Sequence, residues 1–269
     1  MTDVTSGAPL LQITDLATHF LTPTGTVRAV DGVTFGLARG ETLGIVGESG
    51  SGKSVLARSI MRLLPSSGIE TDGSVEFRGI DITQSPEDHL RKLWGPAMAM
   101  VFQDPMTSLN PVMRIGTQLA EGVRTHLGLT RSEAADVALE LVKSVGIPEP
   151  KKRLRQYPHQ LSGGMRQRVV IAIALACGPN LLLADEPTTA LDVTVQSQIM
   201  ELLAAQQLDR DMAMILITHD LGLVAGRTDR IAVMYAGRIV ETAPTAQVFS
   251  NTRMPYTEAL LRSIPRLDD

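Results

Sequence analysis

A single cysteine, Cys177, is present among the 269 residues of this chain, and aromatic side chains account for only 3% of them. One cysteine excludes an intramolecular disulfide and a metal site built from several thiolates, and it suits a reducing, cytosolic compartment. Cys177 is more simply interpreted as a small, buried side chain at the end of a helix than as a redox site.

Long hydrophobic runs are also missing from the sequence. The longest strongly apolar run covers residues 169–177 and is followed by Gly178 and Pro179, whereas a helix needs about 20 apolar residues to cross a bilayer. The first nine residues are small and polar, without the basic and apolar segments of a secretory signal. We therefore expect a protein that neither spans a membrane nor leaves the compartment in which it is made.

Charge of one sign does not dominate, because 25 Lys and Arg residues face 29 Asp and Glu residues, for a net charge of −4. A nucleic-acid partner would require a basic surface, so we expect none. Hydrophobic residues make up 43% of the chain, which is enough to bury the core of one large domain or of two small ones.

Short β-rich runs alternate with helix-period runs along most of the chain, and this alternation predicts an α/β fold. A β-rich flank comes first, with strands expected at 11–16, 27–37 and 41–46. Residues 111–152 have a helical pattern, most clearly at 132–145. The α/β order then resumes with a strand at 180–184, a helix at 193–208 and a strand at 212–218, and a short helical pattern follows at 256–264.

Residues 47–54 match G-x-x-x-x-G-K-S/T, the motif of a phosphate-binding loop, between an apolar strand and a helical run. Backbone N–H groups and the positive end of the helix can bind phosphates, Lys53 can neutralise the β- and γ-phosphates, and the Ser54 hydroxyl can bind Mg²⁺. The motif alone indicates a nucleoside triphosphate and leaves a kinase, a GTPase and a transport ATPase open. The predicted phosphate site comprises Gly47, Ser49, Gly50, Ser51, Gly52, Lys53 and Ser54.

Two carboxylates, Asp185 and Glu186, follow the apolar run 181–184. Such charges are costly unless they emerge at the carboxyl end of the strand, where a cation can meet them. We predict that Asp185 holds Mg²⁺, directly or through water, and that Glu186 accepts a proton from the water that attacks the γ-phosphate. Two solvated acids in a turn before Pro187 are the alternative interpretation.

A second anion site is predicted within residues 161–168. Ser162 can cap a helix there, while Gly163 and Gly164 leave successive backbone N–H groups uncovered. An ordinary helix cap is the alternative. The segment resembles the signature motif of ABC ATPases, in which the signature of one subunit closes on the γ-phosphate held by the phosphate loop of the other subunit.

This resemblance covers approximately residues 10–265 and implies an ABC ATPase fold, that is, a RecA-like P-loop NTPase core with a β-rich subdomain and an inserted α-helical subdomain. It implies ATP and Mg²⁺ as ligands and a dimer of two ATPase subunits, identical or homologous, with two ATP molecules between them. Within one domain spanning 1–269, we expect the β-rich flank and catalytic core at approximately 10–110 and 165–250, the helical subdomain with the signature at 111–164, and the start of a C-terminal extension at 251–269.

Two further catalytic roles come from the same resemblance. Gln103 resembles the glutamine that contacts Mg²⁺ and the attacking water and relays the nucleotide state to the membrane subunits. His219 resembles the switch histidine that touches the γ-phosphate. Without the resemblance, the first would be interpreted as a surface glutamine and the second as a structural or solvated histidine.

Two binding roles have the same origin. The loop of Ala190, Leu191 and Asp192 resembles the one that crosses the dimer interface, and Asp192 is also suited to cap the helix that follows. Phe20 lies where such ATPases place an aromatic ring that stacks on adenine, although it lacks a tyrosine hydroxyl. A buried strand aromatic is the alternative interpretation of Phe20.

Residues 103–111 and 255–265 resemble ATPases of bacterial dipeptide and oligopeptide importers, a branch that also includes nickel and glutathione importers. This implies an ATP-hydrolysing subunit at the cytoplasmic face of the cell membrane that drives two transmembrane permease subunits, which an extracytoplasmic binding protein loads with substrate. Peptides are the expected substrate; nickel, glutathione, a soluble ABC ATPase without a transport role and a non-hydrolysing regulatory subunit are the alternatives. Members commonly carry a longer C-terminal extension, sometimes with a cysteine cluster that binds an iron–sulfur centre, so we expect that this sequence, which ends at Asp269 without such cysteines, is truncated or lacks that module.

Overall fold

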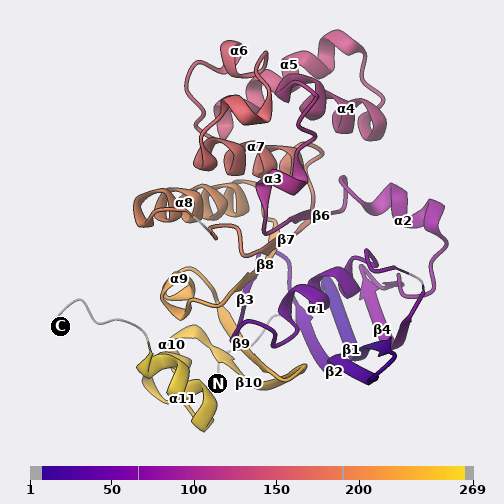
Figure 1. Cartoon of the computed structure of the whole chain (residues 1–269), viewed down its shortest axis with the longest axis vertical. Coiled ribbons are helices and arrows are strands. Elements are labelled where there is room, and N and C mark those ends of the chain that lie inside the picture. The colour runs from indigo at the N-terminus through magenta and orange to yellow at the C-terminus, as the bar shows by residue number, and fades with distance from the viewer. Residues whose placement is uncertain (1–7, 66, 190, 264–269) are drawn as a thin grey trace. The chain divides into compact units, whose positions relative to one another are not determined.

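The computed structural model describes residues 8–65, 67–189 and 191–263. The chain divides into two compact units, of which the first contains residues 1–86 and 213–269 and the second contains residues 87–212. Each unit combines strands with helices (Figure 1), so the predicted α/β class is confirmed.

An antiparallel sheet forms one layer of the first unit, with its strands in the order β2-β1-β4-β5. The sequence predicts only the first half of β1 and does not predict β4, because β4 carries few apolar residues and owes its conformation to pairing with β1. The bounds are β1 (Leu11–Thr22), β2 (Gly25–Leu37), β4 (Ile69–Phe77) and β5 (Ile80–Asp81).

Parallel strands form a second sheet region in the same unit. β3 (Thr42–Val46) pairs in parallel with β8 (Ala213–Thr218) and with β9 (Arg230–Tyr235), and β10 (Arg238–Pro244) pairs antiparallel with β9. Every residue of β3 is buried, as expected for a parallel strand with neighbours on both sides. The carboxyl ends of β3 and β8 therefore lie at one edge, where the segments that follow them meet.

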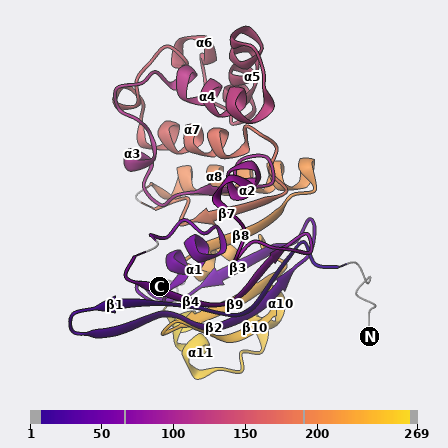
Figure 2. The same cartoon turned by 90° about the vertical axis from the view of Figure 1, so that its right-hand side faces the viewer.

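The helices of the first unit flank these strands. α1 lies against the antiparallel sheet (Figure 1), where the Thr18 hydroxyl lies 2.7 Å from the Ser59 hydroxyl. The C-terminal helices pack beside β9 and β10 (Figure 2). The bounds are α1 (Lys53–Ile60), α9 (Leu221–Val224), α10 (Thr245–Ser250) and α11 (Pro255–Arg262).

The second unit is mainly helical. Thr130 and Glu133 form a reciprocal capping box that begins α5 within one residue of the predicted helix start. The helical segment predicted at 111–164 contains α4, α5 and α6, but its boundaries as a subdomain stay a prediction. The bounds are α2 (Glu87–Leu93), α3 (Pro105–Ser108), α4 (Ile115–Leu127), α5 (Arg131–Ser144), α6 (Pro150–Arg153), a 3-10 helix (Pro158–Gln160), α7 (Gly163–Leu175) and α8 (Val193–Arg210).

Two parallel strands in this unit carry the remaining candidate residues at their ends. β6 (Met98–Val101) pairs with β7 (Leu181–Asp185), and Val101 lies opposite Ala184. Both strands are buried throughout. The polar residues that follow them therefore lie at the carboxyl edge that the two strands share.

No helix within the described ranges has both the length and the apolar character needed to cross a membrane. The apolar run 169–177 belongs to α7 and the turn after it, with Cys177 half-buried just beyond the helix end. Burial raises the pKa of the Cys177 thiol, which keeps it in the unreactive, protonated form at neutral pH.

Candidate functional site

The phosphate loop, residues 47–54, connects β3 to α1 and is packed against neighbouring backbone. A Cβ at Gly52 would overlap the carbonyl oxygen of Ala29, and a Cβ at Gly47 would overlap the carbonyl oxygen of Met234. Gly52 also has φ +106°, a conformation that L side chains rarely adopt. The glycines of the motif are therefore required by close packing as well as by the turn itself.

Lys53 lies at the centre of this loop. Its side chain is 4% exposed, and its ammonium group donates to the carbonyl oxygens of Gly47 at 2.7 Å and of Glu48 at 2.8 Å. A positive charge is thus held beside backbone N–H groups at the start of α1, where Gly52 is the N-cap and supplies no side-chain hydrogen bond. Uncapped N–H groups together with a fixed cation fit the triphosphate of a nucleotide.

His219 lies at the same sheet edge as the phosphate loop. Val46 pairs with Thr218 in the parallel register of β3 and β8. Gly47 directly follows Val46 and His219 directly follows Thr218, so both residues leave the sheet at the same level. The His219 side chain is exposed, and the backbone after it is fixed by Asp220, whose N–H donates to the Thr218 hydroxyl at 3.0 Å. The register places an imidazole at the loop's edge of the sheet, as the switch role requires.

Phe20 lies on β1, half-buried, in register with Val27 and Ile69. Thr18 and Phe20 share one face of this strand because they are two residues apart, and Thr18 contacts Ser59 of α1. The ring therefore lies on the face of the sheet that bears α1, the helix that follows the phosphate loop. Its stacking on adenine stays a prediction.

Asp185 and Glu186 mark the end of β7 in the second unit. The Asp185 side chain is fully buried, with 0% exposure, and Glu186 has a left-handed backbone with φ +46°. Such a conformation is uncommon for a residue other than glycine and is typical of turns at functional sites. The two neighbouring carboxylates therefore differ in their surroundings. The Asp185 carboxylate is buried inside the unit, whereas Glu186 is half-buried at the end of β7.

The Glu186 carboxylate is held by two donors. Its Oε2 atom accepts hydrogen bonds from Nε2 of Gln103 at 2.9 Å and from the hydroxyl of Thr189 at 2.8 Å. Gln103 and Glu186 are 83 residues apart in sequence and meet because each follows the Val101–Ala184 pair by two residues. The structure thus brings together two predicted catalytic residues, and it adds Thr189, which no sequence pattern singled out.

The signature segment begins α7 as predicted. Ser162 is the N-cap, and its hydroxyl accepts a hydrogen bond from the N–H of Met165 at 3.3 Å. Gly163 is exposed, whereas a Cβ at Gly164 would lie only 2.7 Å from Cγ1 of Val195 in α8. The first turn of α7 therefore packs closely on α8 and leaves the Gly163 backbone accessible to an anion.

Asp192 begins α8, next to this signature turn. Its side chain accepts a hydrogen bond from the N–H of Val195 at 2.9 Å, which confirms the predicted helix cap. Asp192 is exposed, and Leu191 lies under the signature, since a Cβ at Gly163 would be 3.6 Å from Leu191 Cδ2. Ala190, part of the same predicted loop, lies outside the described residues, and the interface role of the loop stays a prediction.

The predicted Mg²⁺ ligands are divided between the two units. Ser54 is part of the first unit, whereas Gln103 and Asp185 are part of the second, so their common metal site stays a prediction. A hydroxyl, an amide and a carboxylate are oxygen ligands of the kind that Mg²⁺ prefers alongside phosphate oxygens. No group of three or more His, Cys, Asp or Glu side chains suited to a metal occurs among the residues searched, which are those that the structure describes.

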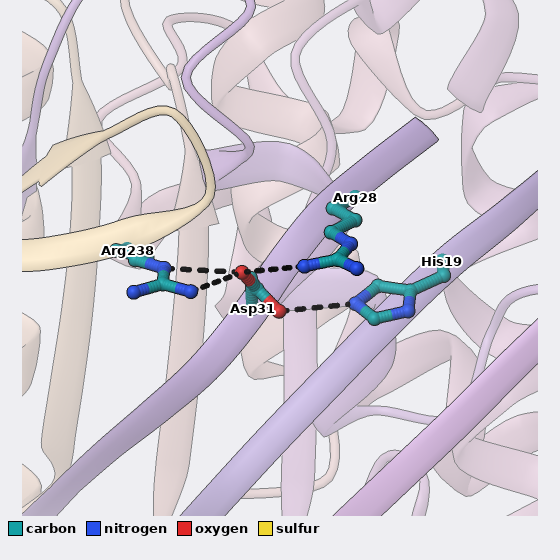
Figure 3. Close-up of polar contacts among 4 residues, drawn as sticks. All are labelled: His19, Arg28, Asp31 and Arg238. Atoms are coloured by element: carbon teal, nitrogen blue, oxygen red, sulfur yellow. Dashed lines mark hydrogen bonds and ion pairs between the residues drawn. The ribbon is translucent and has the colours of Figure 1, made fainter. Parts of the chain in front are cut away.

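A polar cluster supports the phosphate loop from the side of β2. Asp31 accepts hydrogen bonds from Arg238 at 2.7 and 3.0 Å and lies 3.3 Å from the His19 imidazole, with Arg28 nearby (Figure 3). The hydrogen bond from Arg238 is the main reason why the pKa of Asp31 lies below its usual value. The Asp31 backbone N–H donates to the carbonyl of Gly237, whose own N–H donates to the carbonyl of Ser51 in the loop.

Comparison with known protein families identifies this arrangement. The family model described as ABC transporter matches residues 30–189, and the model described as oligopeptide/dipeptide transporter, C-terminal region, matches residues 240–269. The chain therefore belongs to the ABC transporter family.

The curated relatives of this chain include ATP-binding proteins of peptide transport systems. The oligopeptide transport ATP-binding protein OppD of Bacillus subtilis is 52% identical over 96% of this chain and 73% of its own length. The dipeptide transport ATP-binding protein DppD of the same organism is 51% identical over 96% and 78%. A putative peptide import ATP-binding protein of Brucella abortus is 53% identical over 97% and 79%.

Solved structures confirm the predicted ABC ATPase fold. A dimeric, post-hydrolysis structure of the ATP-binding cassette MJ0796 bound to ADP and Pi superimposes with a TM-score of 0.79 at 27% identity, covering 87% of this chain and 98% of that one. CbiO1 of Clostridium perfringens, part of an ABC transporter complex, superimposes with a TM-score of 0.75 at 29% identity, covering 90% and 91%.

Proposed function

We propose that this chain is the ATP-binding and ATP-hydrolysing subunit that powers an ABC importer of peptides. The observation that carries the hydrolytic part is the Glu186 carboxylate, fixed by Gln103 and Thr189 directly after the buried Asp185. The peptide part is supported by the names of the relatives, which are peptide transport and peptide import ATP-binding proteins, and by the match of residues 240–269 to a transporter region of that kind.

ATP binding is the task of the first unit. Backbone N–H groups of residues 47–54 and the Lys53 ammonium bind the phosphates, and Phe20 stacks on the adenine ring. Ser54, Gln103 and Asp185 would hold Mg²⁺, which when bound neutralises charge on the β- and γ-phosphates.

Hydrolysis requires a base and a positioned water. Glu186 accepts a proton from the water through its carboxylate, and Gln103 and Thr189 keep that carboxylate from rotating. Gln103 contacts the same water, and His219 contacts the γ-phosphate. General-base assistance of this kind contributes about 10²–10⁴ to the rate.

The working form is a dimer. Two anion sites in one chain, residues 47–54 and the signature helix, grip the same nucleotide when they come from opposite subunits, and dimeric cassettes among the structural relatives support this arrangement. The dimer acts at the cytoplasmic face of the membrane on two permease subunits, which receive peptide from an extracytoplasmic binding protein.

Replacement of Glu186 by Gln tests the proposal. We expect ATP hydrolysis to fall by about 10²–10⁴, because the amide cannot accept the proton, while the affinity for ATP stays within about two-fold since the phosphate loop is untouched. ATP turnover and binding of a fluorescent ATP analogue measure the two quantities.

A matched control is Glu140→Gln, which changes an exposed carboxylate that pairs with Lys143 on α5 and should retain full activity. Turnover by Glu186→Gln equal to that of this control would remove Glu186 from the role of base. With permeases and binding protein in proteoliposomes, peptide should stimulate hydrolysis by the unchanged chain; stimulation by Ni²⁺ or glutathione instead of peptide would contradict the substrate class.

A further inference from the structure

The C-terminal part of the first unit contacts the phosphate loop at the residue after Gly47. The backbone N–H of Glu48 donates to the hydroxyl oxygen of Tyr256 at 3.1 Å, across 208 residues of sequence. Tyr256 is the second residue of α11, a helix inside the region that matches the oligopeptide/dipeptide transporter C-terminal model. A side chain outside the nucleotide-binding motifs therefore holds the backbone of the phosphate loop.

One further contact fixes Tyr256 itself. Its ring lies against that of Tyr235 at the end of β9, with centroids 4.6 Å apart and planes at 51°, a tilted geometry that aromatic pairs favour. The neighbouring Thr257 side chain is fully buried. Burial raises the pKa of the Tyr256 phenol, so the hydroxyl stays protonated and neutral at physiological pH.

The start of α11 is anchored to β10. The Glu241 carboxylate accepts hydrogen bonds from the backbone N–H groups of Arg253 at 2.9 Å and Met254 at 3.3 Å. These are the residues directly before the helix, which has no side-chain cap of its own. Glu241 therefore fixes the position from which Tyr256 reaches the loop.

The turn between β9 and β10 adds a second attachment to the same loop. The Gly237 N–H donates to the Ser51 carbonyl at 2.9 Å, and its carbonyl accepts from the Asp31 N–H. Met234 packs against the first residue of the loop, because its carbonyl oxygen leaves no room for a Cβ at Gly47. Glu48 and Ser51, at two points of the loop, are thus both held by residues 234–256.

We propose that Tyr256 is a positioning residue for the nucleotide: its hydroxyl fixes the Glu48 backbone so that the phosphate loop is preorganised for ATP. In this proposal Tyr256 acts through the Glu48 backbone and is not itself a phosphate ligand. Preorganisation lowers the free-energy cost of ordering the loop on binding, so the contact affects affinity more than the chemical step. The proposal rests on ATP being the ligand of residues 47–54, as proposed above.

Replacement of Tyr256 by Phe removes only the hydroxyl and keeps the ring contact with Tyr235. We expect the KM for ATP and the dissociation constant of a fluorescent ATP analogue to rise roughly three- to ten-fold, the effect of one net hydrogen bond. We expect kcat to change less than about two-fold, because the variant leaves the base and its donors in place. The thermal midpoint without nucleotide should stay close to that of the unchanged chain, which separates positioning from a general loss of stability.

Tyr235→Phe is the matched control, since Tyr235 is 51% exposed and its hydroxyl forms no hydrogen bond with the loop within the part of the chain that the structure describes; it should leave the affinity unchanged. Glu48→Pro removes the N–H donor itself, and in that background Tyr256→Phe should have no further effect on affinity. Unchanged affinity of Tyr256→Phe, an equal effect of Tyr235→Phe, or additive effects of Glu48→Pro and Tyr256→Phe would each overturn the proposal. Failure of the unchanged chain to bind ATP would instead overturn the proposed function.

Discussion

At the scale of single residues, the carboxylate that we propose as the catalytic base differs from its neighbour in its surroundings. Asp185 and Glu186 are adjacent acids, yet one is fully buried and the other turns outward on a left-handed backbone. The place of Glu186 directly after the apolar run 181–184 and Asp185 predicted it as the base. The structure adds the reason why its carboxylate is fixed, namely donors from Gln103 and Thr189.

The Asp31 cluster gives a prediction at the same scale (Figure 3). The folded-state pKa of Asp31 lies below the ordinary value of 3.8, chiefly because Arg238 donates to the carboxylate. The stabilisation is therefore fully present above about pH 4 and is lost as the pH falls through the lower, folded-state pKa. We expect Asp31→Asn to lower the urea midpoint near pH 7.

The same measurement across pH supplies the control. The difference in urea midpoint between the unchanged chain and Asp31→Asn should shrink as the pH falls below about 4. A difference that persists undiminished at the lowest pH at which both proteins fold would show that Asp31 acts through packing and not through its charge. Salt should also reduce the difference, because the cluster is accessible to solvent.

At the scale of elements, the two helix starts that form the signature region are coupled by packing. A Cβ at Gly164 would approach Val195 Cγ1 to 2.7 Å, closer than real Cβ contacts, whereas a Cβ at Gly163 meets only an ordinary contact at 3.6 Å. We expect Gly164→Ala to destabilise the folded state by about 1–3 kcal/mol through overpacking, as measured by equilibrium unfolding in urea.

Two further variants test whether the loss of stability comes from the contact between Gly164 and Val195. Gly163→Ala changes the same residue type in the same turn and should leave the free energy of unfolding nearly unchanged. Val195→Ala removes the methyl groups that clash, so the double variant with Gly164→Ala should be more stable than the sum of the two single changes implies. Strict additivity of the two changes would contradict a direct contact between the two helix starts.

Elements with strong local signals were predicted closely. The apolar spacing of α5 predicted its bounds to within one residue, and Ser162 and Asp192 cap their helices as predicted. β4 and β10 were not predicted, because their strand conformation depends on pairing with β1 and β9 and not on apolar alternation.

At the scale of the whole molecule, the presence of two anion sites in one chain predicts nucleotide-dependent dimerisation. We expect Glu186→Gln with ATP and Mg²⁺ to shift from monomer to dimer, because in the proposed dimer the signature helix of a second chain completes each phosphate loop, and slow hydrolysis prolongs the ATP-bound state. Size-exclusion chromatography with light scattering measures the mass.

Lys53→Ala in the Glu186→Gln background is the control, since it removes the cation that faces the triphosphate and should keep the chain monomeric. A monomer of Glu186→Gln at saturating ATP would contradict the sandwich arrangement. Equal dimerisation with and without Lys53 would mean that the dimer does not depend on nucleotide.

Local sequence motifs predicted the chemistry that we propose for this protein, because each motif specifies its own local structure. Glycines and Lys53 define a phosphate loop, Ser162 and Asp192 cap helices, and carboxylates at a strand end require a cation. These requirements involve residues close in sequence, where backbone conformation and side-chain type alone decide the outcome.

The distant residues that support this proposed chemistry could be identified only in the folded chain. Gln103 meets Glu186 because β6 and β7 pair in one register, and Tyr256 reaches Glu48 because Glu241 fixes the start of α11. Such contacts span 83 and 208 residues and depend on strand register and helix docking, which no local pattern encodes.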